Sequence, residues 1–109
     1  MESQTDRSVA RAAENEVAFR NANQAIEQRR GELELVGPTP FLCECEEERC
    51  QTLLFLSQEE YASARKEPNW FILAHGHKFR SGTIRSSHDR FVVVEKDGLA
   101  KKIAEREGT

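Results

Sequence analysis

The sequence has no long apolar run and no strong net charge. Its 109 residues carry a net charge of −3, which does not point to a protein whose main partner is a nucleic acid or a membrane surface. No apolar stretch approaches the ~18 residues of a membrane-spanning helix, and the polar first residues do not resemble an export signal. We therefore expect a cytoplasmic protein.

Sequence motifs of common catalytic sites are also missing. There is no Gly-rich phosphate loop, no Gly-x-Ser-x-Gly and no His-Glu-x-x-His. The His-x-Glu and Pro-Cys-x-x-Cys motifs of zinc-dependent deaminases are absent as well. We therefore expect a protein that is not an enzyme.

Cysteine is scarce, but all three copies lie close together. Cys43, Cys45 and Cys50 fall within eight residues, and an odd number of thiols cannot be fully paired as disulfides in one chain. Cys43 and Cys45 lie two apart on an extended segment and point the same way, and the next loop returns Cys50 towards them. This arrangement favours a structural Zn²⁺ ion, although iron or another thiophilic metal suits the same ligands. Redox thiols without metal and ordinary buried cysteines are the alternatives.

Three histidines are candidates for a fourth ligand. His77 follows Gly76, where a backbone without side-chain crowding can turn the imidazole inward. His75 lies two residues earlier on the same face of an extended chain, and His88 falls in an expected turn. Water is a further possibility. The residues therefore favour Cys43, Cys45, Cys50 and His77 as the metal ligands and leave His75 and His88 as competitors.

The cysteine segment is acidic. Residues 41–61 carry six acids against Arg49 alone, and three thiolates with one neutral histidine around Zn²⁺ add a further net charge of −1. We interpret the acidic run as a solvated face that would repel phosphate. Some basic side chain should balance this charge, with Arg49, Lys78 and Arg80 as candidates.

The first part of the chain is expected to form one long helix over residues 8–35, with Ser8 as a possible cap. We place a domain boundary after it, with a helical segment at 1–36 and a small zinc-knuckle α+β domain at 37–109. A thin apolar stripe runs along the helix, formed by Ala12, Phe19, Ala22, Ile26 and Leu33. The stripe could mediate self-association, as in a coiled coil, docking on the chain's own domain, or binding of another protein.

The remaining pattern predicts a small, mainly antiparallel α+β domain. Gly37 and two prolines end the long helix, and Ser57 with Glu60 matches a capping box at the start of a second helix. The expected strands are 41–45, 50–56, 70–73, 81–86 and 90–95, and the expected helices are 58–66 and 99–107.

Several short motifs occur together between about residues 14 and 104. They are Phe19-Arg20 with Asn23 and Ile26-Glu27, Pro40–Cys45 with Cys50, Leu56-Ser57 with Glu60-Tyr61 and Arg65, Pro68 with Phe71, Gly76-His77, and Phe91–Lys96. The combination resembles a family of small, functionally uncharacterised bacterial proteins of the actinobacterial type. The resemblance implies His77 rather than His75 as the fourth ligand, and it implies no activity.

These observations together favour a non-catalytic, zinc-stabilised protein-interaction module that serves as a small regulatory or accessory factor in transcription or signalling. One alternative is a redox sensor in which oxidation of the cysteines releases zinc. A second alternative is a nucleic-acid-binding protein that uses a basic C-terminal segment, formed by Lys78, Arg80, Arg85, Lys101 and Lys102.

Overall fold

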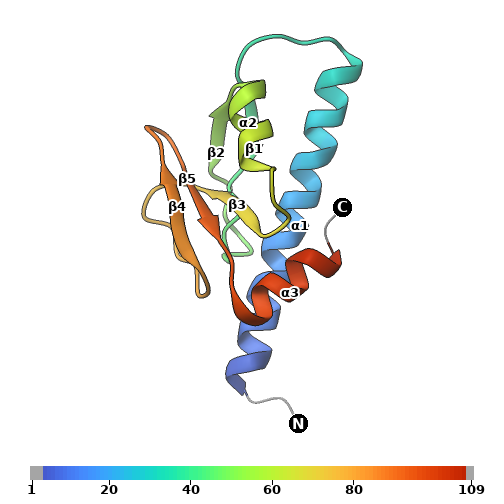
Figure 1. Cartoon of the computed structure of the whole chain (residues 1–109). Coiled ribbons are helices and arrows are strands. Elements are labelled where there is room, and N and C mark those ends of the chain that lie inside the picture. Colours follow the sequence, from blue (N-terminus) through green and yellow to red (C-terminus); the bar gives the residue numbers. More distant parts are fainter. Residues whose placement is uncertain (1–3, 108–109) are drawn as a thin grey trace.

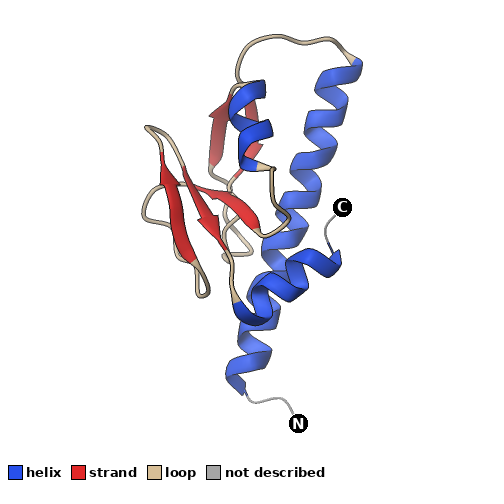
Figure 2. Ribbon diagram, in the orientation of Figure 1, coloured by secondary structure: helices blue, strands red, loops and turns tan. Residues whose placement is uncertain are grey.

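A long helix, α1, runs along one side of the molecule, and two small sheets and two short helices lie beside it (Figure 1; Figure 2). The structure is a computed structural model and describes residues 4–107. In chain order the elements are α1 (Gln4–Glu32), β1 (Thr39–Leu42), β2 (Leu53–Leu56), α2 (Gln58–Ala64), β3 (Trp70–Leu73), β4 (Thr83–Ser87), β5 (Val92–Glu95) and α3 (Gly98–Glu107). The predicted α+β class is confirmed. None of the described helices is long and apolar enough to cross a membrane.

Both sheets are antiparallel. β1 and β2 form a two-stranded sheet, and β3, β5 and β4 form a three-stranded sheet in that order, with β5 in the centre. The predicted pairing of the last two strands is confirmed, since β4 pairs with β5. The first two strands are shorter than predicted: β1 ends at Leu42 and β2 begins at Leu53. The residues between them leave the regular ladder because they bend to bring the cysteines together.

The capping box predicts the start of α2 correctly. The backbone N–H of Glu60 donates to Ser57 Oγ at 3.1 Å, and the Ser57 N–H donates to Glu60 Oε1 at 2.8 Å. Each side chain thus satisfies a backbone donor that the first helical turn leaves free.

The prediction that Ser8 caps α1 is wrong, because the helix begins at Gln4 and Ser8 lies inside it. The helix also ends at Glu32, before the predicted Leu35. At this end Glu34 adopts a positive φ of 54°, the Leu35 N–H donates to the Arg30 carbonyl, and the Glu34 N–H donates to Gly31. This is a Schellman motif, which closes the last turn before Gly37 and the prolines are reached.

The buried face of α1 is largely polar. Glu16, Arg20 and Asn23 are between 0% and 2% exposed, and Ala13 and Val17 on the same face join the apolar core. Arg20 donates to the backbone carbonyl of Ala104 at 3.0 Å and to that of Pro68. Because Ala104 lies in the last turns of α3, this contact satisfies one of the carbonyls that a helix end leaves free.

The predicted apolar stripe lies beside this buried face. Ala22 and Leu33 are exposed, whereas Ala12, Phe19 and Ile26 are partly buried. α1 packs against α3 and β1, so the helix docks on its own chain. Self-association or partner binding through the stripe stays a prediction. The expected boundary after residue 36 falls in the connection from α1 to β1, although α1 shares one core with the elements that follow.

Aromatic and aliphatic side chains fill the space between α1 and the sheets. Phe71, Ile72 and Leu73 are buried, as expected for core residues, and Trp70 is partly buried. Phe41 of β1 stacks on Tyr61 of α2 with ring centroids 4.2 Å apart. This stacking joins the two-stranded sheet to the helix that follows it.

A buried ion pair links α1 to the end of β5. The Lys96 ammonium donates to Glu16 Oε2, and both side chains are at most 2% exposed. Burial raises the pKa of Glu16 from 4.5 to about 6, although Lys96 acts to lower it. Removing one partner of such a pair leaves a buried charge without compensation, which costs about 3–5 kcal/mol.

Glu16→Gln is expected to remove a pH dependence of stability. The raised pKa means that the folded state binds this proton more tightly than the unfolded chain does. The resulting contribution to the free energy of unfolding is complete below about pH 4.5 and is lost as the pH rises through about 6, a change of about 2 kcal/mol. Urea unfolding at a series of pH values measures it, with the exposed Glu14→Gln as the control. Equal slopes for Glu16→Gln and the unmodified chain in this window would contradict the assignment.

Candidate metal centre

The three cysteines lie in the cysteine loop, which we define as residues 43–52 between β1 and β2. β1 and β2 bring the two ends of this loop together, and the Cys43 N–H donates to the Thr52 carbonyl at 3.1 Å. His77 follows the end of β3. Two separate strand ends therefore supply the four candidate ligands.

The predicted ligand atoms converge. The Sγ atoms of Cys43, Cys45 and Cys50 and a ring nitrogen of His77 all lie within 4.8 Å of one another. His77 Nδ1 lies 3.3 Å from Cys43 Sγ and 3.6 Å from Cys50 Sγ. Since metal–sulfur and metal–nitrogen bonds are about 2.0–2.3 Å long, ligand atoms around one tetrahedral ion must lie within a few ångströms of each other. Three Cys and one His are thus positioned to hold a metal ion.

A turn at Gly76 directs His77 towards the cysteines. Gly76 has a positive φ of 80°, and the His77 N–H donates to the Ala74 carbonyl at 3.2 Å. A residue with a Cβ would be strained at this φ. The sequence signal for this ligand, a glycine directly before the histidine, therefore has the expected structural basis.

The other two histidines lie outside the cluster. His75 is exposed, and its Nε2 contacts the backbone carbonyl of His88. The His88 ring stacks on Phe91 with centroids 4.4 Å apart. Of the three candidates, the structure brings only His77 to the sulfur atoms.

Hydrogen bonds to sulfur surround the centre. The Ala74 N–H donates to Cys43 Sγ at 3.2 Å. Burial raises the pKa of the Cys43 and Cys45 thiols. Burial also acts to raise the pKa of Cys50, but hydrogen bonds from the N–H and hydroxyl of Thr52, together with those from Cys45 and Cys43, lower it overall. Donors of this kind stabilise thiolate, which is the form that binds metal.

Glu44 was included in the acidic run that we expected to be solvated, and this expectation is wrong. Its side chain is 0% exposed and lies between two cysteines in sequence. The Arg65 guanidinium donates to both carboxylate oxygens, and the Ile72 N–H donates to Oε1 at 2.9 Å. Burial acts to lower the pKa of Arg65, but the charge of Glu44 and its hydrogen bond, together with smaller contributions from Tyr61, outweigh burial and raise the pKa. The alternation of the extended chain turns Glu44 inward while Cys43 and Cys45 face the metal site.

Asn23 of α1 completes this network. Its amide NH₂ donates to the Leu42 carbonyl and to Glu44 Oε2, both at 2.8 Å, and its carbonyl oxygen accepts from the Leu42 N–H at 2.7 Å. The Asn23 side chain therefore pairs with the edge of β1 as a neighbouring strand would. This contact ties the long helix to the residues that directly precede the first candidate ligand.

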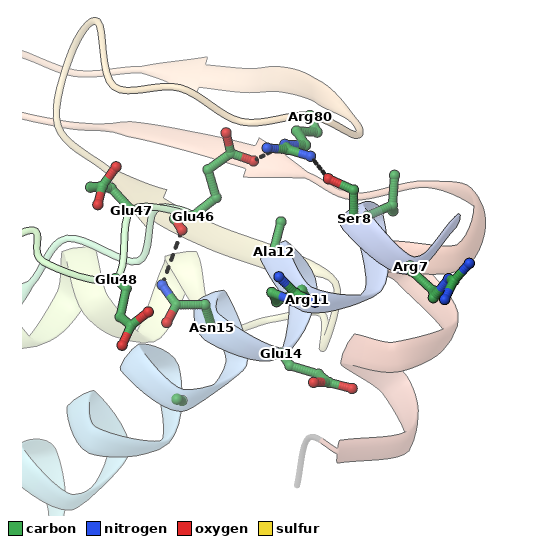
Figure 3. Close-up of a pocket in the computed structure, with 12 residues that line it drawn as sticks. Arg7, Ser8, Arg11, Ala12, Glu14, Asn15, Glu46, Glu47, Glu48 and Arg80 are labelled. Atoms are coloured by element: carbon green, nitrogen blue, oxygen red, sulfur yellow. Dashed lines mark hydrogen bonds and ion pairs between the residues drawn. The ribbon is translucent and has the colours of Figure 1, made fainter. Parts of the chain in front are cut away.

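A second attachment of the loop lies at Glu46, beside an open groove of about 1130 Å³ (Figure 3). Asn15 Nδ2 of α1 donates to the Glu46 carbonyl at 3.1 Å. Arg80 forms an ion pair of 2.9 Å with the Glu46 carboxylate and also donates to Ser8. Of the three bases predicted to balance the acidic loop, Arg80 forms an ion pair with it although its side chain is 50% exposed, and no ion pair of Arg49 or Lys78 occurs within residues 4–107.

The basic side chains proposed for nucleic-acid binding are spread over several elements, and two of them contact other side chains. Arg80 is paired with Glu46, and Arg85 stacks over the Trp70 ring at 4.7 Å. Lys101 and Lys102 are exposed on α3.

Comparison of the chain with protein-family models, with curated proteins and with solved structures found no match. The family resemblance therefore stays an expectation, and the chemistry of the centre is inferred from its own residues.

Sequence reasoning missed the polar network that supports the centre, formed by Glu44, Arg65 and Asn23. A signal for Glu44 was present, because a residue between two cysteines on an extended segment must face away from them. The hydropathy of Glu44 gave no sign that the opposite side is buried.

Asn23→Ala is expected to destabilise the fold by at least about 3 kcal/mol, because buried groups of Leu42 and Glu44 lose their partner at about 1–3 kcal/mol each. Asn21→Ala, two residues earlier and exposed, is the matched control and should change stability by less than about 0.5 kcal/mol. Chemical denaturation of the metal-loaded proteins measures both. Similar stabilities for the two variants would show that the Asn23 contacts carry little energy.

Proposed function

We propose that the chain is a non-catalytic protein-interaction module whose metal centre is a structural Zn²⁺ site. The observation that supports this proposal is the convergence of Cys43, Cys45, Cys50 and His77 within 4.8 Å. Three thiolates and one imidazole form a closed tetrahedral set for Zn²⁺, which leaves no coordination position for a substrate. Thiolate-rich sites also disfavour hard cations such as Mg²⁺ and Ca²⁺.

The surroundings of the centre suit a structural role. The cysteine loop connects β1 with β2, touches β3 through Glu44 and reaches α1 through Asn23 and Asn15. An ion that fixes the loop therefore also fixes the relative positions of these elements. The free energy of binding such an ion adds to the stability of the fold.

Zinc binding can be measured directly. Protein purified under reducing conditions is expected to contain one Zn²⁺ per chain by native mass spectrometry and elemental analysis. His77→Ala should weaken zinc binding by more than about 100-fold, since loss of an outer-shell group alone costs about 10- to 100-fold. His75→Ala is the matched control and should bind zinc as the unmodified chain does. A chelator should also lower the melting temperature, and an unchanged melting temperature would rule out a structural role.

The proposed interaction role depends on apolar side chains that the fold leaves exposed to solvent. Large apolar side chains are exposed near the end of α1 and after it, with Leu33 at 50%, Leu35 at 56% and Val36 at 94% exposure. Exposed apolar groups that cluster in this way are typical of contact surfaces. A setting in transcription or signalling follows only by analogy with other small accessory proteins.

A second candidate function is redox sensing, and the unequal exposure of the cysteines favours it. Cys43 and Cys45 are each 1% exposed, whereas Cys50 is partly exposed. Peroxide could accept two electrons from two of the thiolates. A disulfide would form, the O–O bond would break, and the oxygen atoms would take up protons and leave as water. The remaining sulfur and His77 would then hold zinc weakly.

Stoichiometric peroxide is accordingly expected to release zinc within minutes, and a thiol reductant with added zinc should restore the centre. A colorimetric zinc indicator follows release, and mass spectrometry detects the loss of two hydrogens per disulfide. Retention of zinc until sulfinic acid accumulates would contradict a sensing role and leave a purely structural site.

A further inference from the structure

The four outer edges of the two sheets are not protected equally. Asn23 covers the edge of β1 through its paired contacts with Leu42. The edge of β3 is covered by Glu44, whose N–H donates to the Ile72 carbonyl at 2.8 Å and whose carboxylate accepts from the Ile72 N–H. The edge of β4 contains a register shift between Ile84 and Ser86 and carries the charged Arg85 between them. Bulges and charges of this kind keep sheet edges from pairing with other chains.

β2 has none of these protections. Within residues 4–107 it pairs only with β1, and Figure 1 shows it on the side of β1 that faces away from α1. Its sequence, Leu-Leu-Phe-Leu, has no charge, no proline and no glycine. The flanking residues Gln51, Thr52, Ser57 and Gln58 are uncharged as well. An apolar edge strand without such features is a ready template for another strand.

The hydrogen-bond pattern identifies the backbone groups that are available. The N–H and C=O of Leu42 point away from β2, because they bond to Asn23. The directly opposed Leu53 therefore also points its N–H and C=O away from β1, and so does Phe55 two residues on. These backbone groups of Leu53 and Phe55 form the open edge.

The same two residues form an apolar outer face. Leu53 is 50% exposed and Phe55 is 45% exposed. Across the sheet Leu53 is paired with Leu42, and Phe55 is paired with the exposed Pro40. Leu54 and Leu56 alternate to the buried side. The hairpin is therefore apolar on both faces, although only one of them packs against the core.

We propose that β2 pairs antiparallel with β2 of a second copy of this chain, so that the two hairpins form one continuous sheet. In the register that places Leu53 opposite Phe55 of the other copy, the free N–H and C=O groups of both residues are satisfied across a two-fold axis near Leu54. The outer apolar side chains then become cross-strand neighbours.

The lack of charge along the strand favours a second copy as the occupant. In the antiparallel register every residue from Gln51 to Ser57 lies opposite an uncharged residue of the other copy. A chain with a net charge of −3 can therefore meet itself along this strand without opposing like charges within it. Because the strand is short, the buried area falls below the about 1,200–2,000 Å² of standard interfaces, and a reversible dimer is expected.

Sedimentation equilibrium of the reduced, metal-loaded full chain over a wide concentration range tests this proposal. The unmodified chain should show a monomer–dimer equilibrium. Leu53→Lys combined with Phe55→Lys should weaken the dimer at least about tenfold, equivalent to about 1.4 kcal/mol. Ile84→Lys is the matched control, because Ile84 is 55% exposed on the protected edge of β4, and it should leave the equilibrium unchanged.

A charge-complementary pair separates self-pairing from other dimers. Leu53→Glu combined with Phe55→Glu should also be monomeric, and mixing this variant with the lysine variant should restore a one-to-one dimer. Each sample should keep its zinc content and melting curve, which keeps this test independent of the metal centre. A monomer at every concentration, a dimer that survives the lysine variant, or a mixture that stays monomeric would each overturn the proposal.

Discussion

The buried carboxylate of Glu44 is the contact on which the arrangement around the centre depends. It accepts hydrogen bonds from α1 through Asn23, from the end of α2 through Arg65, and from β3 through the Ile72 N–H. Its neighbours in sequence are two metal-ligand candidates that face the opposite way. One short extended segment thus presents sulfur on one side and a charged cross-link on the other. The position of the sulfurs and the packing of three elements are consequently set together.

The long helix illustrates the same use of polar contacts. Its buried face carries Glu16, Arg20 and Asn23, each paired with a partner from a later part of the chain. Buried ion pairs add little net stability compared with apolar packing, but they tolerate few alternative arrangements. A shift of α1 by one residue would separate all of these partners. The orientation of the helix is therefore specified more by matching polar groups than by apolar area.

This difference explains what could be predicted from the sequence. The capping box at Ser57 and the apolar strand at Phe71 are local signals, and both agree with the structure. Cys43, Cys45 and Cys50 lie close together in the chain, and Gly76 marked the histidine that joins them. Hydropathy could not identify the inner face of α1 or the burial of Glu44, because a paired, buried charge and a solvated one have the same sequence signal. The partners lie 21 or more residues away for Glu44 and 80 residues away for Glu16.

The spacing of the candidate ligands has a consequence for the order of folding. Cys43, Cys45 and Cys50 need only a short loop to meet, whereas His77 lies 27 residues beyond Cys50. Because closing a short loop costs less chain entropy than closing a long one, the thiolates can capture an ion while the rest of the polypeptide is still unfolded. Arrival of the imidazole then requires β3 to be in place beside Glu44. Ion capture would thus nucleate the hairpin, and completion of the coordination shell would report that tertiary assembly is finished.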